Sequence, residues 1–95
     1  MTAQLRMRYE LEDYDAWRAM FDRDPLDRGG SGVVSHRISR DADNDALVLV
    51  DLDFGTVAEA SAFRERLRVL LADPSTPAMA HAEFAVTETT ETATY

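Results

Sequence analysis

Residues 46–54 constrain the fold more than any other segment, because their side chains alternate as they do in a β-strand. Val48, Val50, Leu52 and Phe54 fall on one face, and the other face is also apolar at its start. A strand that is apolar on both faces lies inside a sheet and is covered on both sides. The chain must therefore build other strands beside this one and layers of side chains above and below it.

Three further segments read as strands. Residues 4–11 alternate strictly between apolar and polar side chains, which predicts a strand with one buried face. Residues 33–40 predict a second strand, and the alternation at 84–89 predicts the last one. The tail from about residue 90 is polar and is expected to fray.

Two segments between these strands have the three-to-four-residue period of a helix. Asp13 offers a capping oxygen to the first helix, and the Asp24-Pro25 pair ends it. Thr56 and Glu59 form a capping box for the second helix, which is expected to end near Ala72. The apolar stripes are Tyr14, Trp17 and Phe21 in the first helix and Ala60, Phe63, Leu67, Leu70 and Leu71 in the second. Residues 74–81 are expected to form a loop with a short helical turn.

The resulting order, β-α-β-β-α-β, predicts an α+β fold of the ferredoxin-like kind. Two right-handed crossovers around a hairpin give a four-stranded antiparallel sheet with both helices on one face. The 95 residues are expected to form a single domain, residues 1–95.

The second face of this sheet has no helix to cover it. Its predicted side chains are Arg6, Arg8, Glu10, Leu47, Leu49, Asp51 and Asp53. Arg6 and Arg8 are expected to pair with Asp51 and Asp53, which leaves the two leucines apolar. A small domain has a limited core of its own, so the six of these residues other than Glu10 are predicted to pack against a second copy in a homodimer. The alternative is a solvated face with weak cross-strand pairs.

Composition excludes several classes of function. The net charge of −8 argues against nucleic acid and anionic membranes as partners. The chain has no cysteine, so disulfides, thiolate metal sites and cysteine nucleophiles are absent. It has no apolar run of transmembrane length, and residues 1–6 have no signal-peptide character, which predicts a soluble cytoplasmic protein.

Residues 13–22, DYDAWRAMFD, resemble the opening helix of a bacterial group within the dimeric α/β-barrel superfamily. Further matches are Gly30 and Gly32, residues 35–37, the acidic turn 41–45 and the pair Asp53-Phe54. The resemblance spans residues 4–89 and implies a dimeric α/β barrel with a small pocket in each subunit, between sheet and helices. Relatives are often called cyclases or antibiotic-biosynthesis monooxygenases, and the superfamily also includes haem-degrading enzymes. The resemblance transfers no invariant catalytic set to this chain.

Four residues are candidates for the pocket. His36 is the side chain best suited to act as a general base or haem ligand, and its alternative is a structural role. Tyr9 and Trp17 are predicted to line an aromatic pocket, although Trp17 also has ordinary core spacing. Arg37 is a candidate for neutralising an acidic substrate, or is a solvated strand residue.

Other chemistry is less well supported. His81 is expected in a surface turn, and two distant histidines without a carboxylate motif predict no metal site. Ser31 lacks the surroundings of a nucleophile. Asp51 and Asp53 are expected to form salt bridges rather than an acid–base pair.

The sequence thus predicts a dimeric protein that binds a small apolar or aromatic ligand. The leading hypothesis is a monooxygenase or cyclase that needs no cofactor and acts on an aromatic or polyketide-like metabolite. The alternatives are a non-catalytic interaction or ligand-sensing protein and a haem-binding protein.

Overall fold

The predicted order of elements is confirmed by a computed structural model, which describes residues 2–77 and 79–95. Met1, at the start of the predicted domain, and Ala78, in the loop expected at 74–81, lie outside the described residues. The elements are β1 (Ala3–Leu11), α1 (Tyr14–Asp22), β2 (Val33–Arg40), β3 (Leu47–Phe54), α2 (Val57–Leu71) and β4 (Met79–Glu88).

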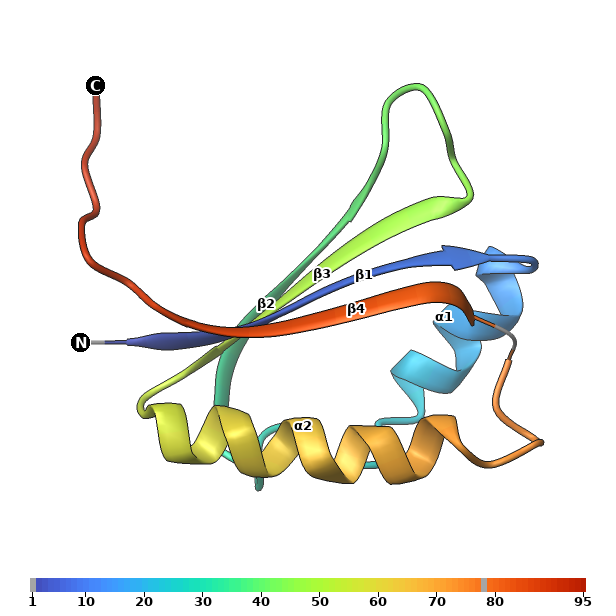
Figure 1. Cartoon of the computed structure of the whole chain (residues 1–95), viewed down its shortest axis with the longest axis horizontal. Helices are drawn as coiled ribbons and strands as arrows, with labels where there is room; N and C mark the ends of the chain where they lie inside the picture. The colour runs from blue at the N-terminus through green and yellow to red at the C-terminus, as the bar shows by residue number, and fades with distance from the viewer. Residues whose placement is uncertain (1, 78) are drawn as a thin grey trace.

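The four strands form one antiparallel sheet in the order β2-β3-β1-β4. In the register of β1 with β3, Leu5 lies opposite Leu52 and Met7 opposite Val50, so the apolar faces of the two strands coincide. Both helices lie on this side of the sheet (Figure 1). The predicted ferredoxin-like α+β fold is therefore confirmed.

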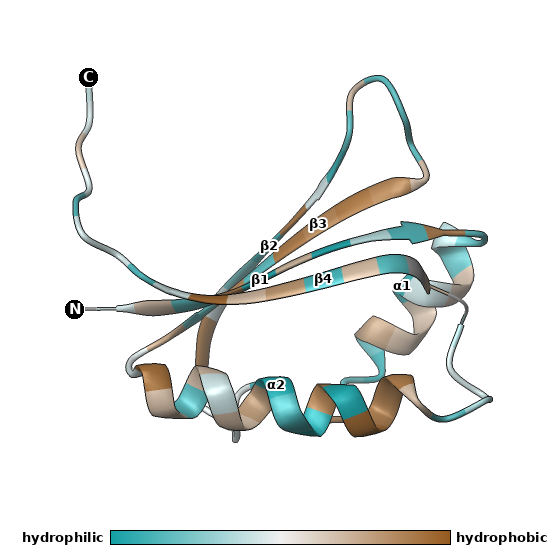
Figure 2. Cartoon of the chain, in the orientation of Figure 1, coloured by the Kyte–Doolittle hydropathy of each residue, from teal (hydrophilic) through white to brown (hydrophobic). Residues whose placement is uncertain are grey.

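The core lies between the sheet and the helices. Its buried members are Ala3, Leu5, Met7, Tyr9, Leu11, Trp17, Phe21, Val48, Val50, Leu52, Phe54, Ala60 and Phe63. The strand β3 is strongly hydrophobic over its first half, whereas the β2–β3 turn is largely hydrophilic (Figure 2). On the other face of β3, Leu49 is 41% exposed. The helices of this chain therefore leave this face of β3 uncovered.

Both predicted helix caps are present. The Asp13 carboxylate accepts a hydrogen bond from the Ala16 N–H at 3.0 Å. The Thr56 hydroxyl oxygen accepts one from the Glu59 N–H at 3.2 Å, and the hydroxyl donates to the Glu59 carboxylate at 3.0 Å. Each cap satisfies a backbone donor that has no partner within its helix.

The last strand begins earlier than predicted. β4 starts at Met79, inside the stretch expected to be a loop, and the described part of 74–81 contains turns rather than a helix. His81 belongs to this strand and not to a surface turn, and its φ of 53° falls at a register shift opposite β1. A bulge of this kind inserts extra chain into a strand and interrupts the alternation by which strands are recognised.

A second register shift lies between Val33 and Ser35 in β2. Val33 packs against the core, whereas Val34 is 73% exposed. Val34 therefore does not share the face of Ile38, as strict alternation would require. No helix in the described part of the chain is long and apolar enough to cross a membrane.

Candidate ligand cavity

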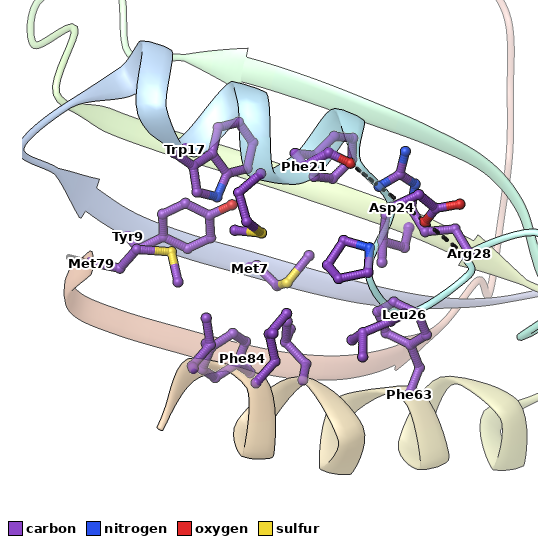
Figure 3. Close-up of a pocket in the computed structure, with 16 residues that line it drawn as sticks. Met7, Tyr9, Trp17, Phe21, Asp24, Leu26, Arg28, Phe63, Met79 and Phe84 are labelled. Carbon is purple, nitrogen blue, oxygen red and sulfur yellow. Dashed lines mark hydrogen bonds and ion pairs between the residues drawn. The ribbon is translucent and has the colours of Figure 1, made fainter. Parts of the chain in front are cut away.

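A cavity opens between the sheet, the two helices and the loop that joins α1 to β2 (Figure 3). Its wall is formed by Met7, Tyr9, Trp17, Met20, Phe21, Asp24, Pro25, Leu26, Arg28, Leu52, Phe63, Leu67, Leu70, Leu71, Met79 and Phe84. The space between these atoms, including the mouth, is about 490 Å³, but the part open to the centre of a water molecule is about 50 Å³. The cavity is therefore narrow, and we call it the slot.

Methionines make the wall of this slot adaptable. Met7, Met20 and Met79 all line it, and the chain has only four methionines. An unbranched thioether side chain changes shape at little energetic cost. Rotation of these side chains can therefore change the width of the slot.

An aromatic row runs along one side of the cavity. The rings of Tyr9 and Trp17 have their centroids 5.6 Å apart, and those of Trp17 and Phe21 are 5.2 Å apart. These separations are typical of favourable aromatic pairs. Tyr9 comes from the buried face of β1, and Trp17 comes from the apolar stripe of α1. Both residues line the cavity.

Tyr9 provides a neutral hydroxyl inside this apolar space. Its side chain is only 3% exposed, and burial raises the pKa of the phenol well above its ordinary value. The Trp17 side chain shifts the pKa in the opposite sense, but burial outweighs it. The two groups point toward one another (Figure 3). The Tyr9 phenol therefore stays protonated at neutral pH and is able to donate a hydrogen bond.

This pKa shift predicts a loss of stability at alkaline pH. The Tyr9 phenol ionises near pH 10.0 in the unfolded chain but at a higher pH in the folded protein. Above pH 10.0 the unfolded chain binds fewer protons than the folded protein does. The free energy of unfolding therefore falls as the pH rises, by at most about 1.4 kcal/mol per pH unit for this one group. Urea unfolding between pH 9 and 11 measures the slope, and Tyr9→Phe should reduce it. Equal slopes in both proteins would contradict the prediction.

The opposite end of the cavity carries a charge. One guanidinium nitrogen of Arg28, Nη1, donates a hydrogen bond to the Phe21 carbonyl at 2.7 Å and lies 3.4 Å from the Asp24 carboxylate. The guanidinium carbon is 3.8 Å from the centre of the Phe21 ring, a cation–π contact. Tyr9 and Arg28 lie toward opposite ends of the wall (Figure 3).

The loop that carries Arg28 is held in place by polar contacts. The Asp24 carboxylate accepts the Arg28 backbone N–H at 2.9 Å. From α2, Arg66 donates to the Leu26 carbonyl at 2.9 Å and to the Ser31 hydroxyl at 2.6 Å. The Ser31 hydroxyl donates in turn to the Leu26 carbonyl at 2.8 Å, which is a structural role. These bonds fix the loop over one end of the slot.

The remaining pocket candidates lie outside the cavity wall. His36 pairs with Leu52, so it is on the helix-facing side of the edge strand β2, but its side chain is exposed. Its ring meets the edge of Phe21 at a centroid distance of 5.2 Å. Arg37 pairs with Asp51 and so lies on the opposite face of the sheet. Neither residue is among those that line the cavity.

The six residues predicted for the dimer face share the open side of the sheet, where they belong to β1 and β3. Arg6 and Asp51 form the expected ion pair, with Nη1 3.4 Å from the carboxylate. The Asp53 carboxylate accepts a hydrogen bond from the Ser35 hydroxyl at 2.7 Å. The others are Arg8, Leu47 and Leu49, and Arg8 lies opposite Leu49 in the register.

Comparisons with known proteins show the fold of this chain. No family model matches the sequence, and no curated protein sequence does. Two structures of SnoaB from Streptomyces nogalater, described as a cofactor-independent oxygenase, match at TM-scores of 0.70 for a mutant form and 0.68. The identities are 17% and 15%, and each match covers 96% of this chain and 95% of the other.

Two other solved structures share the fold. A Nitrosomonas europaea protein, provisionally named an antibiotic biosynthesis monooxygenase, matches at a TM-score of 0.56 and 17% identity over 93% of this chain and 90% of that one. Rv0793 from Mycobacterium tuberculosis matches at 0.51 and 13% identity over 99% and 100%. At these identities the likeness establishes the fold, and this fold is the one that the sequence resemblance implies.

Proposed function

We propose that this protein is a cofactor-independent oxygenase of a flat aromatic or polyketide-like molecule. The observation that carries the proposal is the slot between sheet and helices, where an apolar, methionine-rich wall surrounds the neutral hydroxyl of Tyr9 and the indole of Trp17. Small-molecule sites are typically concave and apolar, with a few polar groups that orient the ligand. The fold-level likeness to SnoaB supports the proposal, because that protein is described as a cofactor-independent oxygenase.

The chemistry requires little of the protein. An electron-rich substrate with an activated CH₂ group gives up two hydrogens and four electrons to O₂. One oxygen atom becomes a carbonyl of the product and the other leaves as water. The protein's part is to hold the substrate in a dry space and to stabilise the negative charge that develops on it before O₂ reacts. Tyr9 provides a hydrogen bond for that purpose, because its phenol stays protonated.

Oxidation of anthrone tests the proposal. Anthrone is a three-ring compound whose CH₂ group is oxidised to the carbonyl of anthraquinone. With ¹⁸O₂, we expect the protein to accelerate this oxidation above the rate in buffer and to place ¹⁸O in the product. Tyr9→Phe should slow the reaction by about a hundredfold, the usual effect of removing a hydrogen bond to a developing oxyanion. Tyr95→Phe, in the exposed tail, is the matched control.

The second reading is a binding protein without catalysis. The indole N–H of Trp17, the chain's single tryptophan, gives one NMR signal that reports occupancy of the slot. A shift of this signal on addition of anthrone, without any gain in oxidation rate, would favour ligand sensing over oxygenation for this probe. If anthrone neither shifts the Trp17 signal nor is oxidised faster than in buffer, both the oxygenase and the binding protein are contradicted.

A homodimer through the open face is part of the same proposal. The face combines the half-exposed Leu49 with the Arg6–Asp51 pair, so it offers apolar area and both signs of charge. A two-fold axis brings one such patch against its own copy, and a patch with both charges can complement itself. Packing of this kind would cover the side of β3 that the helices leave open.

A further inference from the structure

The cavity wall is almost entirely uncharged. Among the residues that the structure describes along it, Asp24 and Arg28 alone carry charge. Arg28 is the more enclosed of the two, since its side chain is 18% exposed and that of Asp24 is 36% exposed. Water therefore screens the carboxylate more than the guanidinium, and a ligand inside the slot meets mainly the positive charge.

The guanidinium of Arg28 is held in place, but not all of its hydrogen-bond donors have a partner in the described part of the chain. Its Nη1 is held by the Phe21 carbonyl, and its plane is held by contact with the Phe21 ring. Its Nε and Nη2 donate no hydrogen bond to any part of the chain that the structure describes. An arginine presents five N–H donors in a rigid fork, and pairs of them fit a carboxylate. Arg28 thus has donors left for a ligand.

Asp24 does not block this role. Its contact with Nη1 is 3.4 Å, longer than the 2.7–2.9 Å that is usual for a charge-assisted hydrogen bond. The same carboxylate is already satisfied by the Arg28 backbone N–H at 2.9 Å. When a ligand anion binds the guanidinium, Asp24 therefore keeps a partner and the loop keeps its shape.

We propose that Arg28 is the anion-recognition residue of the cavity and that the ligand is a flat aromatic compound with an acidic oxygen at one end. This inference rests on the proposed function and narrows its substrate class. The acidic group, a carboxylate or an ionised phenol, binds at Arg28. The ring body lies along Phe21 and Met20, and a hydroxyl or carbonyl group at the far end meets Tyr9. Arg37 is the sequence-based candidate for neutralising an acidic substrate, and we assign that role to Arg28 instead.

Two probes of matched shape test this proposal. 2-Naphthoate is anionic at neutral pH, and 2-naphthalenemethanol has the same rings without the charge. Calorimetry gives the affinity for each, and the Trp17 indole signal shows that binding is in the slot. We expect wild-type protein to prefer the anion by about tenfold or more, because a hydrogen bond to a charged group is worth that factor.

Arg28→Met keeps the length of the side chain and removes its charge. It should lower the affinity for 2-naphthoate by about tenfold to a hundredfold and change the affinity for 2-naphthalenemethanol by less than about twofold. Arg28→Lys keeps the charge but loses the planar fork, and should retain part of the preference. Arg23→Met is the matched control, since Arg23 is an exposed arginine at the end of α1, outside the cavity wall, and both affinities should survive its change.

The outcomes separate the two proposals. If both probes bind with equal affinity to wild-type protein, Arg28 does not recognise anions, although the cavity still binds aromatic molecules. If neither probe moves the Trp17 signal, the ligand-binding cavity itself is refuted. If Arg28→Met does not fold, equal affinities in wild-type protein still overturn the role of Arg28, and a reduced preference in Arg28→Lys supports it.

Discussion

Trp17→Ala is expected to lower the free energy of unfolding by about 3–5 kcal/mol, the usual cost of truncating a buried aromatic residue. The indole is 1% exposed, and the rings of Tyr9, Tyr14 and Phe21 surround it at centroid distances of 5.2–5.9 Å. Because small domains are stable by only about 5–15 kcal/mol, this change removes a large share of the total. Urea unfolding followed by circular dichroism measures the loss.

Val69→Ala is the control for this substitution. Val69 lies on α2 and is 76% exposed, so its truncation should change stability by less than about 0.5 kcal/mol. A loss below about 1 kcal/mol for Trp17→Ala would show that the indole is not what holds α1 to the sheet. The aromatic row would then be a ligand surface only, and not part of the core.

Leu49→Lys should convert the dimer that we propose into monomers. Leu49 lies opposite Arg8 on the open face, so a lysine there adds a cation beside an existing one. In a two-fold interface the change occurs twice, and each copy must bury an unpaired charge, which typically costs several kcal/mol. Sedimentation equilibrium at micromolar concentration should give the dimer mass for wild-type protein and the monomer mass for the variant.

Val69→Lys makes the same change of charge on an exposed part of α2, away from the open face. It should leave the dimer intact. Wild-type protein that sediments as a monomer would overturn the proposed assembly. Dissociation by both lysine variants alike would point to net charge, and not to the open face, as the cause.

The fold could be predicted because short-range rules govern most of it. The alternation in β1 and β3 and the caps at Asp13 and Thr56 each depend on neighbours within a few residues. The start of β4 could not be predicted in this way. The left-handed backbone at His81 and the register shift beside it are set by pairing with β1, which is distant in sequence.

The site was only partly predictable for a related reason. Tyr9 and Trp17 follow from periodicity, since each lies on the buried face of its own element. His36 and Arg37 are neighbours on one strand, so they face opposite sides of the sheet and cannot both enter one pocket. Arg28 had no signal in the sequence, because its place at the cavity depends on a loop that is held by bonds from α2 and from Asp24.

The three methionines of the slot have a chemical consequence as well as a mechanical one. A thioether is readily oxidised to a sulfoxide, which is polar and chiral. Met7, Met20 and Met79 stand where molecular oxygen would react in the proposed chemistry. If O₂ takes only two electrons from the substrate and leaves as peroxide, without forming the product carbonyl, that peroxide can oxidise the methionines of the wall. If O₂ reacts only when substrate is bound, these methionines are protected from oxidation.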